Sequence, residues 1–161
     1  MKWDEINTAL GQAAYLMAII AHRFGYKFAK YKINLCGAMS TIQLKYPAGG
    51  HSSGQSSSSS QSKNTKYELY YGVPGVSEDR FNTALAYLLD CLHGLMQDVW
   101  AKMSKYPSAN DGSSKSLLYK IDGENIGGQS QSIKYSSNDS QTWTSSMKYF
   151  LTNLQWLVYM T

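Results

Sequence analysis

Residues 81–103 read FNTALAYLLDCLHGLMQDVWAKM, and their apolar side chains recur every three or four positions. The stripe consists of Phe81, Leu85, Leu88, Leu92, Leu95, Val99 and Met103. This spacing places one apolar side chain per turn on the same helical face, so the sequence predicts a long amphipathic helix. Ser77 is a suitable N-cap, and we expect the helix to run to about Lys105, before Pro107.

Two further amphipathic helices are predicted, one on each side of the central helix. The first runs from about Asp4 to Phe24 and is followed by Gly25, a suitable left-handed cap. The last begins around Asn138, where Gln141 is placed to complete a capping box. The first stripe is Trp3, Ile6, Leu10, Ala13, Met17, Ile20 and Phe24, and the last is Trp143, Met147, Phe150, Leu154, Leu157 and Val158. Their tryptophans are expected to pack in the core.

Between the helices the apolar period changes to two, which is typical of strands. Strands are predicted over 27–35, 41–46, 66–71 and 117–121, near Ile126 and over 131–135, with a hairpin turn at Asp122-Gly123. In the first strand, Ala29, Tyr31, Ile33 and Leu35 are expected to face the core. Residues 51–65 contain 8 serines in 15 positions, so we expect a flexible loop there.

The order of elements indicates a repeated unit of strands followed by a helix. The predicted helices start near residues 4, 78 and 139, which are 74 and 61 positions apart. We therefore predict an α+β fold in which three helices pack with small antiparallel sheets, as one domain over residues 1–161. Three helices accompany only two groups of strands, so the first sheet is expected to be missing.

Composition excludes several classes of protein. With 161 residues, 43% apolar and 16% charged, the chain is expected to bury a core and not to be a disordered tail. Its net charge of +4 is spread along the chain, which permits an anionic partner without requiring one. The longest apolar run, Ala13 to Ala21, is too short to span a bilayer. A secretory signal peptide is also not expected, because Asp4 and Glu5 occupy the region where a signal peptide carries basic residues. We expect a cytoplasmic protein.

No arrangement of reactive side chains indicates catalysis. His22, His51 and His93 have no second ligand one helical turn away, and the two cysteines form no CxxC pair. The sequence also lacks a Gly-x-Ser-x-Gly elbow and a phosphate-binding loop. Three aspartates of the central helix, Asp79, Asp90 and Asp98, are expected on its solvated face. We predict no enzyme activity, no metal and no cofactor.

Tyrosine and lysine alternate between Tyr26 and Lys32, a pattern that can bind single-stranded nucleic acid by stacking. Strict alternation is more typical of a strand with one buried and one basic face. A basic module that binds single-stranded nucleic acid therefore remains the alternative function.

Several segments resemble the C-terminal domain of the Beclin family. They are WDEINTALGQ at 3–12, GYKF at 25–28, Leu89-Asp90-Cys91, Ser132-Ile133-Lys134, Trp143 and FLTNLQW at 150–156. These matches occur in the family's order and extend over almost the whole chain. The resemblance is thus far more specific than a single short motif.

The resemblance implies a β-α repeated, autophagy-specific domain. Members are non-catalytic scaffolds of the class III phosphatidylinositol 3-kinase complex in autophagy and endosomal or vacuolar sorting. The partners implied are the lipid kinase catalytic subunit, its regulatory pseudokinase subunit and a coiled-coil sister subunit, on endosomal or phagophore membranes. Since the family domain starts with strands before its first helix, we expect this chain to be an N-terminally truncated form.

Family members that insert into bilayers use bulky aromatic residues in the loop before the second helix. Here that loop is GVPGVSED at 72–79, which has no aromatic residue and two acidic ones. Its membrane-contact candidates are Val73, Pro74 and Val76, with Tyr70 and Tyr71 beside them. The resemblance therefore implies only weak association with an anionic membrane surface.

Overall fold

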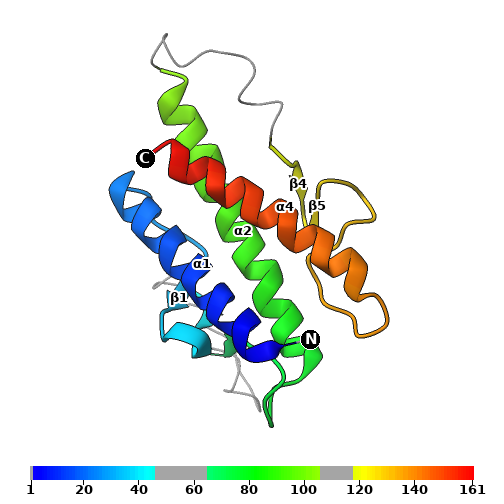
Figure 1. Ribbon diagram of the computed structural model, residues 1–161. Coiled ribbons are helices and arrows are strands. Elements are labelled where there is room, and N and C mark those ends of the chain that lie inside the picture. The colour runs from blue at the N-terminus through cyan, green and yellow to red at the C-terminus, as the bar shows by residue number, and fades with distance from the viewer. Residues whose placement is uncertain (1, 46–64, 106–117) are drawn as a thin grey trace, which may run out of the picture.

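The computed structural model describes residues 2–45, 65–105 and 118–161. This part of the chain contains three α-helices, α1 (Trp3–Arg23), α2 (Glu78–Met103) and α4 (Ser140–Tyr159), and one 3-10 helix, η1 (Gly37–Met39). The strands are β1 (Tyr31–Asn34), β2 (Thr41–Leu44), β3 (Lys66–Glu68), β4 (Ile121–Asp122) and β5 (Asn125–Ile126). Figure 1 shows the three helices with small sheets beside them, which confirms the predicted α+β fold class.

Both sheets are antiparallel. The first has the order β1-β2-β3, and its register places Ile33 opposite Ile42 and Ile42 opposite Tyr67. These three side chains share the sheet face that packs on α2, because cross-strand partners point to the same side. The second sheet pairs β4 with β5 through a turn at Gly123, whose φ is +59°.

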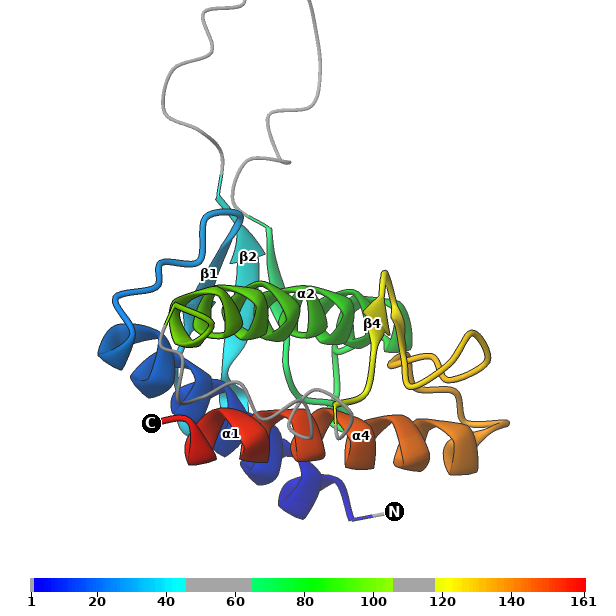
Figure 2. The same ribbon diagram turned by 90° about the horizontal axis from the view of Figure 1, so that it is seen from above.

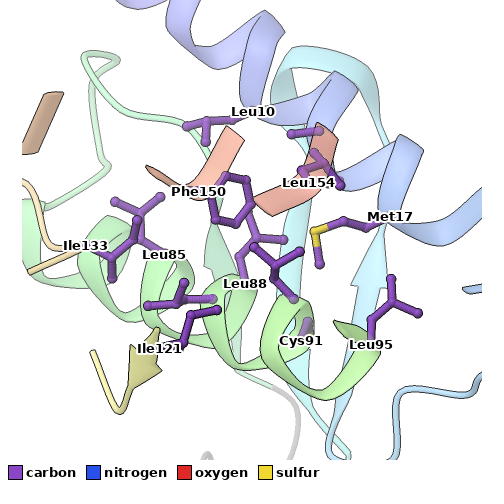
Figure 3. Close-up of a cluster of buried hydrophobic side chains, with 14 of the residues drawn as sticks. Leu10, Met17, Leu85, Leu88, Cys91, Leu95, Ile121, Ile133, Phe150 and Leu154 are labelled. Atoms are coloured by element: carbon purple, nitrogen blue, oxygen red, sulfur yellow. The ribbon is translucent and has the colours of Figure 1, made fainter. Parts of the chain in front are cut away.

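The core lies around α2. Figure 3 shows Leu85, Leu88 and Leu95 of α2 close to side chains of α1, α4 and the segments around β4. The other labelled side chains include Leu10, Met17, Ile121, Ile133, Phe150 and Leu154, all of them buried. Each large apolar side chain that is fully buried stabilises the fold by roughly 1.5–3 kcal/mol. The stripes predicted from the sequence therefore form most of this core.

The ends of α1 and α2 lie close to their predicted positions. The Ser77 hydroxyl accepts the Arg80 N–H at 3.3 Å, which confirms the predicted N-cap of α2. The helix ends at Met103, two residues before the expected Lys105. Gly25 follows α1 with φ of +66°, the left-handed conformation expected of it.

The N-cap predicted for α4 was wrong. Asp139 is the N-cap, and its carboxylate accepts the Thr142 N–H at 3.1 Å. Hydrogen bonding to the Thr142 side chain, followed by this bond to its main chain, lowers the pKa of Asp139. The capping box expected from Asn138 and Gln141 is not formed, because the helix begins one residue later and the Asp139 carboxylate caps the Thr142 N–H. Val158, predicted on the core stripe, is exposed.

The first group of strands is shorter than predicted. The strand expected over 27–35 is limited to β1, and Ala29 and Leu35 are exposed instead of facing the core. A bend at Ala29 and Lys30 interrupts the extended backbone, and before it Tyr26 and Phe28 pack against each other with ring centroids 5.3 Å apart. β2 and β3 end at Leu44 and Glu68, although the next residue, Leu69, is still buried.

The strand expected over 131–135 was also wrong. Its one pairing is an isolated bridge between Ser132 and Asn125, although Ile133 is buried. The strand expected over 117–121 begins at Ile121 in the structure. Tyr46, residues 51–64 of the expected serine-rich loop, and Leu117 lie outside the described residues.

Three buried asparagines, one on each helix, hold the main chain of a distant tyrosine at two points. Each amide Nδ2 donates to the tyrosine carbonyl, and each Oδ1 accepts the N–H of the same tyrosine. The pairs are Asn7–Tyr71 (2.9 and 3.0 Å), Asn82–Tyr135 (2.8 and 2.6 Å) and Asn153–Tyr119 (2.8 and 2.9 Å). We call each pair an asparagine clamp. The clamps satisfy main-chain groups that lie outside the sheets.

Two of the clamps support the repeated unit. Residues 7–10 and 82–85 both read Asn-Thr-Ala-Leu, near the start of α1 and of α2. Asn7 holds the segment that leads into α2, and Asn82 holds the segment that leads into α4. Each of these helices therefore fixes the entry to the next one in the same way.

Candidate functional site: the loop before α2

Tyr71 fixes the start of the loop that joins β3 to α2. Its main chain is held by the clamp from Asn7 of α1. Its ring stacks on Phe81 of α2 with centroids 5.4 Å apart, and it meets the Trp3 ring edge-on at 4.9 Å. The loop therefore leaves the fold from a point fixed by two helices.

Five aromatic rings pack together beneath the loop. We call Trp3, Tyr71, Phe81, Tyr135 and Trp143 the aromatic cluster. Trp3 is central to it, because its ring lies 5.0 Å from Tyr135, 5.9 Å from Phe81 and 6.0 Å from Trp143, centroid to centroid. Edge-to-face pairs at such distances contribute about 0.5–1.5 kcal/mol beyond the area they bury. The cluster joins the first turns of α1, α2 and α4 under the loop.

Two glycines set the path of the loop. Gly72 has φ of +80°, and a Cβ at this position would lie 2.5 Å from Cγ of Trp3. Glycine is therefore required both by the conformation and by the closeness of the indole. Gly75 has φ of +88° but faces open space. Across Pro74 and Gly75, the Val76 N–H donates to the Val73 carbonyl at 3.4 Å and closes a turn.

The membrane-contact candidates have different exposures. Pro74 is exposed, and Val73 and Tyr70 are half-buried. Val76 is half-buried and packs against the core, and Tyr71 belongs to the aromatic cluster. Pro74 is thus the exposed residue at the tip, with half-buried Val73 beside it, while the half-buried Tyr71 ring packs in the aromatic cluster. Complete burial of a valine is worth about 1.5–3 kcal/mol, so two small side chains give a weak apolar contact.

Charge around the loop does not favour an anionic surface. Glu78 and Asp79 occupy the first turn of α2, immediately after the tip. The nearby Arg80 guanidinium is held by the Glu68 carboxylate through two hydrogen bonds of 2.8 and 2.9 Å. Its hydrogen bonding to Glu68 raises the pKa of Arg80. The arginine charge is therefore balanced within the protein, while Asp79 is exposed beside the tip and Glu78 is half-buried.

The tyrosines of the alternative nucleic-acid surface lie against α2. The Tyr31 ring is 4.8 Å from that of Tyr87, and its hydroxyl donates to Asp90 at 2.9 Å. Burial, followed by this hydrogen bond, raises the pKa of Tyr31. The Tyr26 ring packs on Phe28, and its hydroxyl lies beside Gly94. Rings used for packing cannot also stack on bases, so this arrangement disfavours the alternative.

The residues considered for chemistry are spread over the fold. Cys91 is buried, which raises the pKa of its thiol to about 12, and Cys36 is exposed. Asp90 and Asp98 form ion pairs with Lys30 at 3.2 Å and Lys102 at 2.6 Å. Within residues 2–45, 65–105 and 118–161, no three His, Cys, Asp or Glu side chains gather as a metal site would require. In the same part of the chain, no helix is long and apolar enough to cross a bilayer.

Asn7 and Trp3 position the loop before α2, and this role was not predicted from the sequence. The stripe placed Trp3 in the core, but it did not show that Trp3 lies under the loop. Asn7 interrupts no pattern, and nothing local indicates that its partner is Tyr71, 64 positions away. The one available signal was the repeated Asn-Thr-Ala-Leu at 7–10 and 82–85, which marks two polar side chains at equivalent positions.

Comparisons with known proteins point to one family over almost the whole chain. The family model described as Apg6 BARA domain matches residues 1–161. The chain is 29% identical to Beclin-1 of Danio rerio and 29% identical to a Beclin-1-like protein of Drosophila melanogaster, each over 97% of this chain and 32% of the relative. It is 27% identical to Beclin-1-like protein B of Dictyostelium discoideum, over 98% of this chain and 16% of that protein. The chain thus spans a third or less of these relatives.

Proposed function

Because this chain belongs to the Apg6 BARA domain family, we propose that it is a non-catalytic scaffold in autophagy. The observation that carries the proposal is the family match over residues 1–161. Its relatives are about three times as long or longer, so what they do as whole proteins is transferred here as a proposal. In this proposal the scaffold binds protein partners and associates peripherally with membranes.

We further propose that its partners are the subunits of the class III phosphatidylinositol 3-kinase complex. These are the lipid kinase catalytic subunit, its regulatory pseudokinase subunit and a coiled-coil sister subunit. Residues 1–161 act there as one Beclin-type domain, in the cytoplasm and at endosomal or phagophore membranes. The family resemblance supports this assignment, and the reaction itself belongs to the kinase subunit.

The loop before α2 supplies the membrane contact in this proposal. Its tip presents Val73 and Pro74, and its start at Tyr71 is held by the Asn7 clamp and the aromatic cluster. A loop anchored at one end before binding loses less conformational entropy when it meets a membrane. Its small apolar area and its acids predict weak binding, which becomes effective when partners bring the domain to the surface.

Co-purification tests the scaffold proposal. The tagged chain is co-expressed with the catalytic, pseudokinase and sister subunits, and the complex is isolated by affinity and size-exclusion chromatography. We expect the chain to elute with the kinase subunits. A folded chain that elutes alone, while the other three subunits assemble, would contradict the proposal.

Flotation tests the loop. The chain is mixed with liposomes containing phosphatidylinositol and phosphatidylserine, alone and together with the kinase subunits. We expect Val73→Asp to reduce flotation, because a carboxylate replaces an apolar group at the tip. Val158→Asp is the matched control, since Val158 is an exposed valine on α4. Equal flotation of the two variants would exclude the loop as the contact.

A further inference from the structure

A ridge on α2, formed by half-buried His93 and exposed Gln97, separates two hollows. His93 and Gln97 lie one turn apart, and their side-chain nitrogens are 3.0 Å from each other. Both residues line a hollow of about 560 Å³ toward the segment before β4 and a hollow of about 220 Å³ toward the segment before β1. In Figure 2, the strands β1 and β4 that follow these segments lie at different positions along α2. We call the ridge and the two hollows the α2 groove.

The larger hollow has an apolar interior and a basic rim. Met96 and Trp100 of α2 line it together with Leu118, Tyr119 and Ile121. Lys120 is the charged side chain at the rim, and it is exposed. The described residues that line this hollow include no aspartate or glutamate. An apolar side chain with a neighbouring carboxylate complements this surface.

The larger hollow keeps its shape through an asparagine clamp. Asn153 of α4 holds the main chain of Tyr119 at 2.8 and 2.9 Å, and the Tyr119 ring stacks on Tyr149 at 4.0 Å. The segment carrying Leu118 to Ile121 is therefore fixed against α4 before any partner binds. A preformed wall reduces the entropy lost on binding.

The smaller hollow contains an acid that is already paired. The Asp90 carboxylate accepts a hydrogen bond from the Tyr31 hydroxyl at 2.9 Å and from Lys30 Nζ at 3.2 Å. Two donors therefore balance this charge, and it repels an incoming carboxylate less than a free aspartate would. Gly94 lets the Tyr26 hydroxyl approach α2, since a Cβ there would be 2.4 Å from that oxygen.

We infer that the α2 groove binds an acidic peptide segment of a partner protein, with one apolar side chain in each hollow. The segment crosses the His93–Gln97 ridge, and a carboxylate of the segment lies beside Lys120. Two hollows divided by one ridge match the spaced apolar anchors by which peptides bind grooves, and the basic rim supplies the charge complementarity. The inference rests on the proposed scaffold function, because it assigns that scaffold a second partner surface.

A random library of 12-residue peptides displayed on phage tests the inference. We expect selection on the folded chain to enrich peptides with two apolar positions and an excess of aspartate and glutamate. The selected peptides should shift the backbone amide NMR signals of His93, Met96 and Ile121. Enrichment of basic or uncharged peptides, no enrichment, or shifts confined to other surfaces would overturn the inference.

Charge reversal supplies the matched comparison. Lys120→Glu should weaken the selected peptides about five-fold or more, since it replaces attraction at the rim by repulsion. Lys32→Glu makes the same change at an exposed lysine of β1 that lines neither hollow, and should change the affinity less than about two-fold. Equal effects of the two variants would overturn the inference.

The peptide selection and the co-purification test the groove and the scaffold function separately. If peptides are selected as expected but the chain does not elute with the kinase subunits, the scaffold assignment fails and the groove stands. If the chain elutes with those subunits but selects no acidic peptide, the groove fails and the scaffold assignment stands.

Discussion

The Asn7 side chain holds Tyr71 by both of its main-chain groups, across 64 positions of sequence. Asn7 is buried in the first half of α1, and Tyr71 begins the loop that leads into α2. A single amide therefore replaces the pairing that a neighbouring strand would give to this part of the chain. The position of the loop tip depends on this contact more directly than on the β1–β3 sheet, which ends at Glu68.

Asn7→Ala should lower the free energy of unfolding by about 2–3 kcal/mol. The substitution removes two hydrogen bonds and leaves the N–H and the carbonyl of Tyr71 without partners in a partly buried place. Urea unfolding followed by circular dichroism measures the change. Asn34→Ala is the control, because the half-buried Asn34 amide donates to the side chains of Thr41 and Gln43 on the sheet, so its loss strands no main-chain group. Its effect should stay below about 1 kcal/mol, and equal losses would contradict the clamp.

Gly72→Ala should destabilise the protein more than Gly75→Ala. Both glycines have positive φ, which costs a residue with a Cβ about 1–2 kcal/mol. At Gly72 the added Cβ would also lie 2.5 Å from the Trp3 ring, whereas Gly75 faces open space. Thermal unfolding of the two variants isolates the contact with the indole, because the backbone cost is shared. If the two midpoints fell equally, the indole would not be the reason for glycine at position 72.

The helices and most of the core followed from apolar spacing alone. A stripe such as Leu85, Leu88 and Leu92 records burial directly, because each turn must present an apolar side chain to the same neighbour. The stripe is least informative at a helix end, and Val158 shows this: it lies one residue from buried Leu157 but is exposed. Nothing in the local sequence distinguishes the two.

Strand lengths and the site depended on tertiary contacts that local patterns do not contain. Alternation over 27–35 predicted one long strand, but Tyr26 and Phe28 pack as a pair before β1 begins. The loop could be located from the family resemblance, and its glycines were visible in the sequence. The packing of Tyr71 could not be predicted, because it requires Asn7 and Trp3 to meet a segment far along the chain.

Native thiol labelling should distinguish the two cysteines. Cys36 is exposed, whereas Cys91 is 2% exposed and its pKa is raised to about 12, first by burial and then by Asp90. Thiolate is the reactive form, so Cys91 should not react at pH 8. A disulfide-exchange reagent should therefore titrate one thiol in the native protein and two in urea. Cys36→Ser removes the fast reaction, and any remaining rapid labelling would show that Cys91 is accessible.

Stability should fall at alkaline pH, in part because Cys91 must stay neutral in the folded state. Its thiol has a pKa of about 12 when folded, against an ordinary value of 9.0 for the unfolded chain. Between these values the unfolded chain has lost the proton that the native protein retains, so the free energy of unfolding decreases as pH rises. The contribution is fully present below pH 9 and should shrink by about 1 kcal/mol between pH 8 and pH 10. Tyr31 adds a loss of the same sign, since its pKa is also raised by burial.

Urea unfolding of Cys91→Ala at both pH values should give a smaller decrease in the free energy of unfolding than the parent shows, whatever the substitution costs at pH 8. An equal decrease in the two proteins would exclude the buried thiol as a contributor.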